Sequence, residues 1–191
     1  MQLLKDRILN SGKNLGRGIL KVDGFINHQV DPELMDACGA ELARRFAHVG
    51  ATKVMTVEIS GIAPALMTAK YLKLPVVYAR KTKPITMPET VFLTLAPSHT
   101  KGVMTELMVS PEYLKNNERV LIIDDFLASG QTILGLARLA QAAGASLVGI
   151  GALVEKLFEG GREALTPLGV PIESLACIVN MDNGQVIFGD Y

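Results

Sequence analysis

Two neighbouring carboxylates, Asp124 and Asp125, follow a continuous apolar run at residues 120–123. The short loop after them contains Ser129 and Gly130 and leads directly into a helical pattern. Glycine lets the backbone approach a ligand closely, and the N–H groups at a helix start, together with hydroxyls, can surround a phosphate. Carboxylates accept hydrogen bonds from hydroxyl groups. A phosphorylated sugar carries both kinds of group, so these residues predict a sugar-phosphate site.

Two common nucleotide motifs do not fit this loop. It lacks the Gly-Lys-Ser/Thr ending of a P-loop, and it lacks the three-glycine spacing of a dinucleotide-binding turn. By its form alone, the segment also suits an ordinary strand-to-helix connection in which Asp124 only caps a turn. The residue pattern leaves these two interpretations open.

Short β-branched or aliphatic runs alternate with helical patterns along the chain. Asp31 and Pro32 begin the first of these helices, as N-cap and first helical residue, and Gly50 ends it. The other expected elements are strand 53–59, helix 62–72, strand 75–80, strand 119–125, helix 131–143, strand 146–154, strand 175–179 and a hairpin strand at 185–188. This alternation predicts an α/β domain around a mostly parallel sheet, with ligands beyond the carboxyl ends of the strands.

Residues 81–110 break the alternation with two strand-like runs, 91–95 and 103–109, joined by a polar turn. Between Arg80 and Lys101 there are four basic side chains and one acidic one. A basic excursion from the sheet could form a mobile flap over an anionic ligand. Composition alone also suits a solvated surface hairpin.

Composition excludes several classes of protein. The 191 residues suit one domain, and the 19 basic and 19 acidic side chains exclude a chain-wide basic surface for nucleic acid. Aromatic residues make up 5% of the chain, too few for a surface of stacked bases. The longest apolar run, 147–154, is too short to span a membrane. Cys38 and Cys177 are expected to be buried free thiols, and a cytoplasmic location is expected.

The segment 120–132, with its four aliphatics, two acidics, three-residue spacer and Ser-Gly-x-Thr, resembles the phosphoribosyl pyrophosphate (PRPP) motif of type I phosphoribosyltransferases. It is most similar to the purine branch, and the segments 19–29 and 154–156 resemble its xanthine-specific members. The resemblance implies a type I phosphoribosyltransferase fold in a single domain, 1–191. It also implies a flexible hairpin-like flap at about 81–110, and a small hood from the first ~30 residues and the C-terminal segment.

The resemblance assigns PRPP to several segments of this chain. Asp124 and Asp125 would hold the ribose hydroxyls and act as the catalytic residues. The remaining PRPP contacts would be the 5′-phosphate loop Ala128, Ser129, Gly130, Gln131 and Thr132, the pyrophosphate loop at Ser60 and Gly61, and the basic pair Arg80 and Lys81. In purine members this basic pair often reaches PRPP from a neighbouring subunit, so a homodimer is expected.

For the base, the resemblance points to Leu20, Asn27 and Lys156. Leu20 would form an apolar wall, and the Asn27 amide offers a donor and an acceptor for a dioxopurine edge. The Lys156 ammonium can only donate, which suits a carbonyl oxygen and penalises an amino group. The expected reaction joins xanthine to PRPP, with Mg²⁺ on the diphosphate.

Three alternatives remain open from the sequence. The first is a phosphoribosyltransferase for another base, such as hypoxanthine/guanine, adenine or orotate. The second is a non-catalytic regulator that senses PRPP, including an RNA-binding one with a local basic patch. The third is a sugar-phosphate-binding protein without activity.

Overall fold

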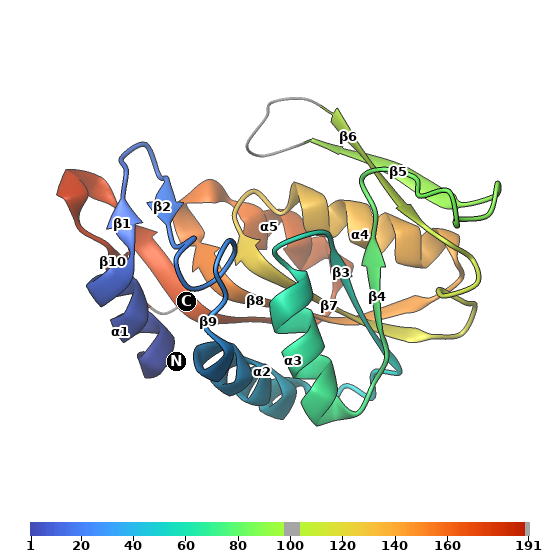
Figure 1. Cartoon of the computed structure of the whole chain (residues 1–191), viewed down its shortest axis with the longest axis horizontal. Helices are drawn as coiled ribbons and strands as arrows, with labels where there is room; N and C mark the ends of the chain where they lie inside the picture. The colour runs from blue at the N-terminus through green and yellow to red at the C-terminus, as the bar shows by residue number, and fades with distance from the viewer. Residues whose placement is uncertain (98–103, 190–191) are drawn as a thin grey trace.

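The fold is a three-layer α/β arrangement, seen here in a computed structural model that describes residues 1–97 and 104–189 (Figure 1). Its central sheet has the strand order β10-β9-β8-β7-β3-β4, and every pair is parallel except β10 with β9. The strands are β3 (Lys53–Val57), β4 (Val76–Ala79), β7 (Arg119–Leu127), β8 (Ser146–Lys156), β9 (Ile172–Asn180) and β10 (Ile187–Phe188). The mostly parallel sheet flanked by helices was expected and is confirmed.

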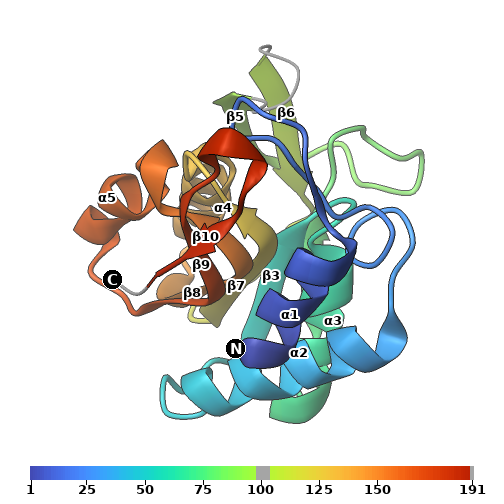
Figure 2. The same cartoon turned by 90° about the vertical axis from the view of Figure 1, so that its left-hand side faces the viewer.

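Helices cover both faces of this sheet, as the side view shows (Figure 2). One face carries α1 (Gln2–Ser11), α2 (Pro32–Phe46) and α3 (Ile62–Leu72), and the other carries α4 (Gln131–Ala142) and the short α5 (Gly161–Leu165). Successive residues of a strand point to opposite faces, so Leu121 and Ile123 pack with the first helical layer and Val120 and Ile122 with the second. Burial on both faces explains the continuous apolar run of β7.

The helices of the core were predicted at the right places in the sequence, but not all of their ends were predicted correctly. Asp31 caps α2 as expected, because its carboxylate accepts from the N–H groups of Glu33 and Leu34, each over 3.1 Å. α2 ends at Phe46, before the stop expected at Gly50, whereas α3 has the predicted limits.

Three strands of the central sheet, β7, β8 and β9, are longer than predicted. The ladder between β7 and β8 continues through the pairs Phe126 with Val154 and Leu127 with Glu155. The acidic pair of residues 124 and 125, and Lys156 as well, are therefore strand residues, held by the sheet itself. A rigid strand positions a side chain more closely than a loop does.

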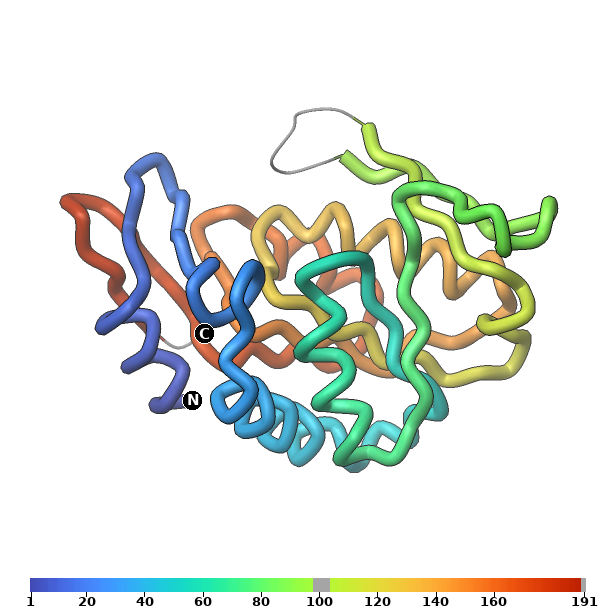
Figure 3. Tube along the Cα trace, viewed as in Figure 1, coloured from blue at the N-terminus to red at the C-terminus, as the bar shows by residue number. Residues whose placement is uncertain are grey.

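The N-terminal segment lies beside the C-terminal turn at one end of the molecule (Figure 3). Its two-stranded hairpin consists of β1 (Lys13–Asn14) and β2 (Leu20–Lys21). The amide of Asn14 donates to the carbonyl oxygens of Met181, over 2.5 Å, and Gln185, over 3.1 Å. The residue pattern of this segment predicted neither a helix nor a strand, and its role as a hood stays a prediction.

A separate antiparallel hairpin, β5 (Phe92–Pro97) and β6 (Met104–Val109), rises above α4 (Figure 1). Arg138 of α4 fixes β5 by donating to the Thr94 hydroxyl over 3.0 Å and to the Leu95 carbonyl over 2.8 Å. The predicted flap thus contains two antiparallel strands; residues 98–103, and with them Lys101, lie outside the described residues. Across the described ranges, none of the helices has the length and apolar character to cross a membrane.

Candidate active site

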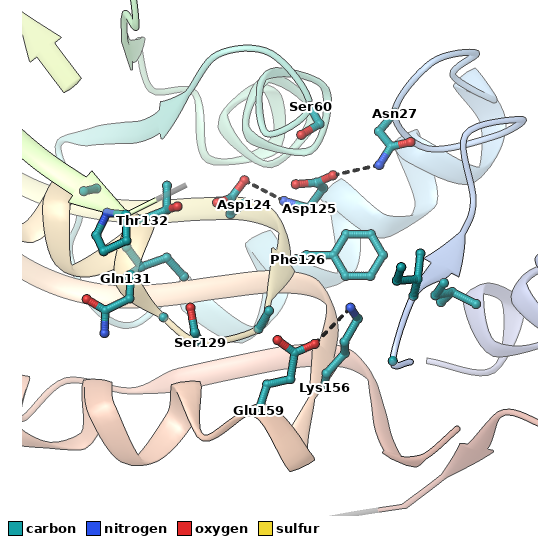
Figure 4. A pocket seen from close by; sticks show the side chains of 18 of the residues that line it. Asn27, Ser60, Asp124, Asp125, Phe126, Ser129, Gln131, Thr132, Lys156 and Glu159 are labelled. Atoms are coloured by element: carbon teal, nitrogen blue, oxygen red, sulfur yellow. Dashed lines mark hydrogen bonds and ion pairs between the residues drawn. The ribbon is translucent and has the colours of Figure 1, made fainter. Parts of the chain in front are cut away.

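The acidic pair lies at the carboxyl end of β7, where both carboxylates are nearly buried (Figure 4). The backbone N–H of Asp125 donates to the Asp124 carboxylate over 2.9 Å, and the Asn27 amide donates to the Asp125 carboxylate over 3.3 Å. Burial, and then the negative charge of Asp125, raise the pKa of Asp124 well above its ordinary value. The pair therefore resists carrying two negative charges until a ligand with hydroxyls or positive character approaches.

The loop after β7 presents backbone donors to the same cleft. Gly130 adopts a left-handed conformation, with φ of 74°, at the N-cap of α4, and glycine adopts this at no steric cost. The first N–H groups of α4 follow it and have no partner within the helix, so they can bind an anion. The hydroxyls of Ser129 and Thr132 line the cleft beside them. This geometry is suited to binding a phosphate.

The loop between β3 and α3 approaches the acidic pair from the next strand. Ser60 lines the cleft, whereas Gly61 lies against its floor. A Cβ on Gly61 would lie 2.2 Å from the Thr56 hydroxyl oxygen and 2.6 Å from a carboxylate oxygen of Asp124. Only glycine fits there without displacing one of these groups. The peptide bond between Glu58 and Ile59 in this loop is cis.

The two basic residues after β4, Arg80 and Lys81, face different pockets. Lys81 lines the cleft, and its backbone N–H donates to the Glu58 carboxylate over 2.6 Å. The Arg80 guanidinium forms an ion pair with Glu58 over 2.6 Å and lines a second pocket of about 530 Å³, beside the ring of Tyr78. The structure therefore brings Lys81, and not Arg80, to the acidic pair of the same chain.

The other end of the cleft suits a planar ring. The Lys156 ammonium, almost buried, lies 5.6 Å from the centre of the Phe126 ring and 3.0 Å from a Glu159 carboxylate oxygen. In Figure 4 the Phe126 ring lies between Lys156 on one side and Asn27 on the other. The buried Leu20 of β2 adds an apolar wall.

Sequence reasoning missed several residues here. Phe126, Phe158 and Glu159 line the cleft without having been singled out, and so does Arg17. Phe126 could have been found, because it directly follows the acidic pair in a strand. Glu159 could have been found from its spacing three residues after Lys156, which suits an ion pair.

One cleft of about 1290 Å³ joins these parts. The predicted site residues that line it are Leu20, Asn27, Ser60, Lys81, Asp124, Asp125, Ala128, Ser129, Gly130, Gln131, Thr132 and Lys156. Gly61 lies beneath its floor and Arg80 faces the second pocket. The cleft therefore has two carboxylates between the helix start at Gly130 and an end that contains the Phe126 ring (Figure 4), an arrangement that matches the order of groups in a nucleotide.

Residues 31–176 match the phosphoribosyl transferase domain. This chain belongs to the phosphoribosyltransferase family. It is 52% identical to the xanthine phosphoribosyltransferase of Deinococcus deserti, over 98% of this chain and 97% of that protein. It is 47% identical to the xanthine phosphoribosyltransferase of Latilactobacillus sakei, over 100% of this chain and 97% of that protein.

Solved structures of the family share the fold. The adenine phosphoribosyltransferase of Rhodothermus marinus is 25% identical, with a TM-score of 0.73 over 93% of this chain and 100% of that chain. That of Thermoanaerobacter pseudethanolicus is 26% identical, with a TM-score of 0.68 over 77% of this chain and 82% of that chain. The expected phosphoribosyltransferase fold and family are thereby confirmed, while the roles of the individual site residues stay predictions.

Proposed function

We propose that this chain transfers the phosphoribosyl group of PRPP to N9 of xanthine, giving xanthosine 5′-monophosphate and pyrophosphate, as a purine salvage enzyme. The names of the full-length relatives support xanthine as the base. The observation that carries the proposal is the hydrogen bond between Asn27 and Asp125, which are 98 positions apart in sequence. It places a side chain suited to a dioxopurine edge directly beside a carboxylate suited to a ribose hydroxyl.

Lys156 supplies the base preference in this proposal. Its ammonium is held beside the Phe126 ring by Glu159, and it can only donate hydrogen bonds. A purine carbonyl accepts from it, whereas the amino group of adenine offers no acceptor and would leave the ammonium hydrogen that points at the base without a partner; such a mismatch discriminates strongly. Phe126 offers a flat apolar surface for the base.

The reaction needs no protein nucleophile. As the bond between the ribose C1 and the pyrophosphate oxygen weakens, positive character develops on the sugar ring, and N9 of the purine attacks from the opposite face. The C1–N9 bond forms as the C1–O bond breaks, pyrophosphate leaves with the bonding electrons, and the purine N–H proton is released to water. Asp124 and Asp125 stabilise that charge electrostatically and orient the ribose through its hydroxyls. Burial and Asp125 raise the pKa of Asp124, and positive character developing on the sugar would oppose this shift by favouring the ionised form.

The two loops bind the ends of PRPP. Backbone N–H groups at the start of α4, with the hydroxyls of Ser129 and Thr132, hold the 5′-phosphate. Ser60 and Lys81 face the diphosphate. The β5–β6 hairpin lines the cleft at Ala96, and its closure would exclude the water that hydrolyses PRPP.

Mg²⁺ fits this site as a cation carried mainly by the substrate. Across the described ranges no cluster of three His, Cys, Asp or Glu residues could hold a metal ion. Mg²⁺ prefers hard oxygen ligands and commonly uses substrate phosphates with one or two carboxylates, and Asp124 and Asp125 are such carboxylates. When bound, it would neutralise the leaving diphosphate.

We also infer a homodimer in the cytoplasm. Arg80 lies outside the cleft of its own chain, as expected if it reaches the PRPP of a neighbouring subunit. Tyr78 and Ile85 are exposed large side chains near it in sequence, and their burial in an interface would be favourable. Two buried free thiols, Cys38 and Cys177, suit a reducing compartment. Neither nucleic acid nor a membrane is part of the proposed function.

Pyrophosphate release from PRPP, Mg²⁺ and a panel of purines tests the proposal. Release should be fastest with xanthine, and Lys156→Ala should raise the KM for xanthine about tenfold or more, with little change in the KM for PRPP. Equal loss for both substrates would make Lys156 a structural residue. Release only with hypoxanthine, guanine or adenine would assign another base, and PRPP binding without release would indicate a non-catalytic sensor.

A further inference from the structure

Glu155 and Arg162 form a buried ion pair that no step of the proposed reaction uses. Glu155, at the end of β8, is 1% exposed. Arg162, on α5, donates to both of its carboxylate oxygens, over 2.7 and 2.6 Å, in a bidentate arrangement. A third guanidinium donor reaches the Ile172 carbonyl oxygen of β9 over 3.2 Å. Bidentate pairs of this kind fix orientation as well as distance.

The helix that carries Arg162 supports the phosphate loop from behind. A Cβ on Gly161 would lie 2.0 Å from the Ala128 carbonyl oxygen and 2.9 Å from the Gly130 backbone nitrogen. Conversely, a Cβ on Gly130 would lie 3.0 Å from the Gly161 carbonyl oxygen and 3.3 Å from the Leu165 side chain. The two backbones are therefore in direct contact, with no side chain between them.

α5 has only five residues, so its own hydrogen bonds cannot hold it in place. Leu165 anchors one end in the core by burial. At the other end, beside Gly161, the three hydrogen bonds of Arg162 tie the helix to β8 and β9. Burial is non-directional, whereas these bonds specify one orientation.

We propose that Arg162 is a positioning residue, whose bidentate pair with Glu155 holds α5 against residues 128–130 and so aims the loop's N–H groups at the 5′-phosphate of PRPP. Neither member of the pair lines the cleft. Because Glu155 directly precedes Lys156, the same pair ties the phosphate loop to the strand end that reads the base. This inference rests on the proposed function, in that it takes the loop as the phosphate site.

The test compares two fragments of PRPP by titration calorimetry, with Mg²⁺ present throughout. Arg162→Lys keeps the charge opposite Glu155 but cannot make the bidentate pair together with the Ile172 bond. The dissociation constant of ribose 5-phosphate should rise about tenfold, as for one charged hydrogen bond, while that of pyrophosphate changes by less than twofold. In turnover, the KM for PRPP should rise more than kcat falls.

Arg45→Lys is the matched control. Arg45 also pairs with carboxylates, those of Glu41 and Glu173, and also donates to a carbonyl oxygen, that of Ser174 over 3.3 Å, but it joins α2 to β9 away from the loop. Both fragments should bind this variant as they bind the unmodified chain. If such pairs acted only through the general stability of the fold, both variants would lose the same amount of fragment binding.

The double variant Glu155→Gln/Arg162→Met covers the case in which the single variant fails to fold, because it leaves no buried charge without a partner. It should unfold cooperatively. It should bind ribose 5-phosphate at least tenfold more weakly than the unmodified chain does, while its dissociation constant for pyrophosphate changes by less than twofold. Unchanged ribose 5-phosphate binding, or equal weakening of both fragments, would overturn the positioning role. If the unmodified chain bound both fragments but released no pyrophosphate with any base, the proposed function alone would fail.

Discussion

Two loops of this cleft leave neighbouring strands in the same direction and enter helices, yet they are held by different means. The loop after β7 rests on the backbone of α5, where Gly161 touches the Ala128 carbonyl. The loop after β3 has one backbone hydrogen bond to β4, from the Glu58 N–H to the Ala79 carbonyl over 3.0 Å. It otherwise rests on side chains: Gly61 lies against Thr56 and Asp124, and the Glu58 carboxylate reaches the basic pair after β4.

This difference matters for what each loop can tolerate. Backbone atoms fixed in strands and helices cannot move without displacing whole elements, because protein interiors are closely packed. Side-chain oxygens can rotate away at modest cost. We therefore expect the β7 loop to be a rigid phosphate site, and the β3 loop to be adjustable, as a site for a departing diphosphate requires.

The largest effect is expected for Gly161→Ala. The added methyl would lie 2.0 Å from the Ala128 carbonyl oxygen and must push the loop or α5 away. A displacement of about 1 Å can cost about 100-fold in rate, so kcat/KM for PRPP should fall by about that factor. Initial-rate kinetics with thermal unfolding measure both effects.

Gly169→Ala is the control for this prediction. Gly169 has φ of 68° and open space around its Cβ position, so the substitution strains the backbone without touching the cleft. It should lower the unfolding temperature and leave kcat/KM unchanged. Equal activity in Gly161→Ala and the unmodified chain would show that the β7 loop is not held rigidly.

The same contrast explains how far the sequence could lead. The β7 loop was recognisable because strand, acidic pair, glycine and helix are consecutive in the chain, and the structure keeps residues 128–132 together in the cleft. The β3 loop gave a weak signal, because Ser60-Gly61 before a helix is also an ordinary cap. What distinguishes Gly61 is its contact with Asp124, 63 positions away, and such a contact has no local pattern.

The support of the β7 loop could not be predicted either. Gly160 and Gly161 look like a turn in the sequence, and α5 is too short for a periodic signal. The roles of Arg162 and Arg80 depend on which strands are neighbours in the sheet. The strand order β9-β8-β7-β3-β4 decides this. The fold class could be predicted from the alternation of strand and helix patterns along the chain. The pairs Arg162 with Glu155 and Arg80 with Glu58 depend on how the elements pack in space.

A smaller effect is expected for Gly61→Ala. The methyl would clash with the Thr56 hydroxyl and the Asp124 carboxylate, which can both rotate. Overpacking of this kind costs about 1–3 kcal/mol, so kcat/KM should fall about tenfold. Thr56→Ala removes the closest oxygen, and the double variant should recover most of the loss. A double-mutant cycle with Thr56→Ala alone measures the coupling; additive losses would contradict a direct clash.

Asp124, which both loops approach, is expected to cost stability at neutral pH. Its pKa is raised by burial and by Asp125, so the folded state keeps the proton to a higher pH than the unfolded chain does. The protonated carboxyl therefore contributes fully to the free energy of unfolding below the ordinary pKa of 3.8. This contribution is lost as the pH rises through the pKa of the folded state.

Asp124→Asn should therefore raise the unfolding temperature by a few degrees at pH 7.5 and by less at pH 4, while turnover falls. Asparagine retains an oxygen to accept from the Asp125 N–H, so the local backbone is preserved. Calorimetric scans at the two pH values measure the difference. A stabilisation that is the same at both values would show that the Asp124 charge is not its cause.

The smallest effect is expected for Glu58→Gln in the adjustable loop. Glutamine can still accept from the Lys81 N–H but loses the ion pair with Arg80, which is partly exposed. Partly exposed pairs contribute up to about 1 kcal/mol, so the KM for PRPP should rise only about two- to threefold. Glu41→Gln, which weakens a partly exposed pair with Arg45 away from the cleft, should leave that KM unchanged. A tenfold rise for Glu58→Gln would mean that side chains can hold a loop as firmly as backbone packing does, and the contrast between the two loops would then be lost.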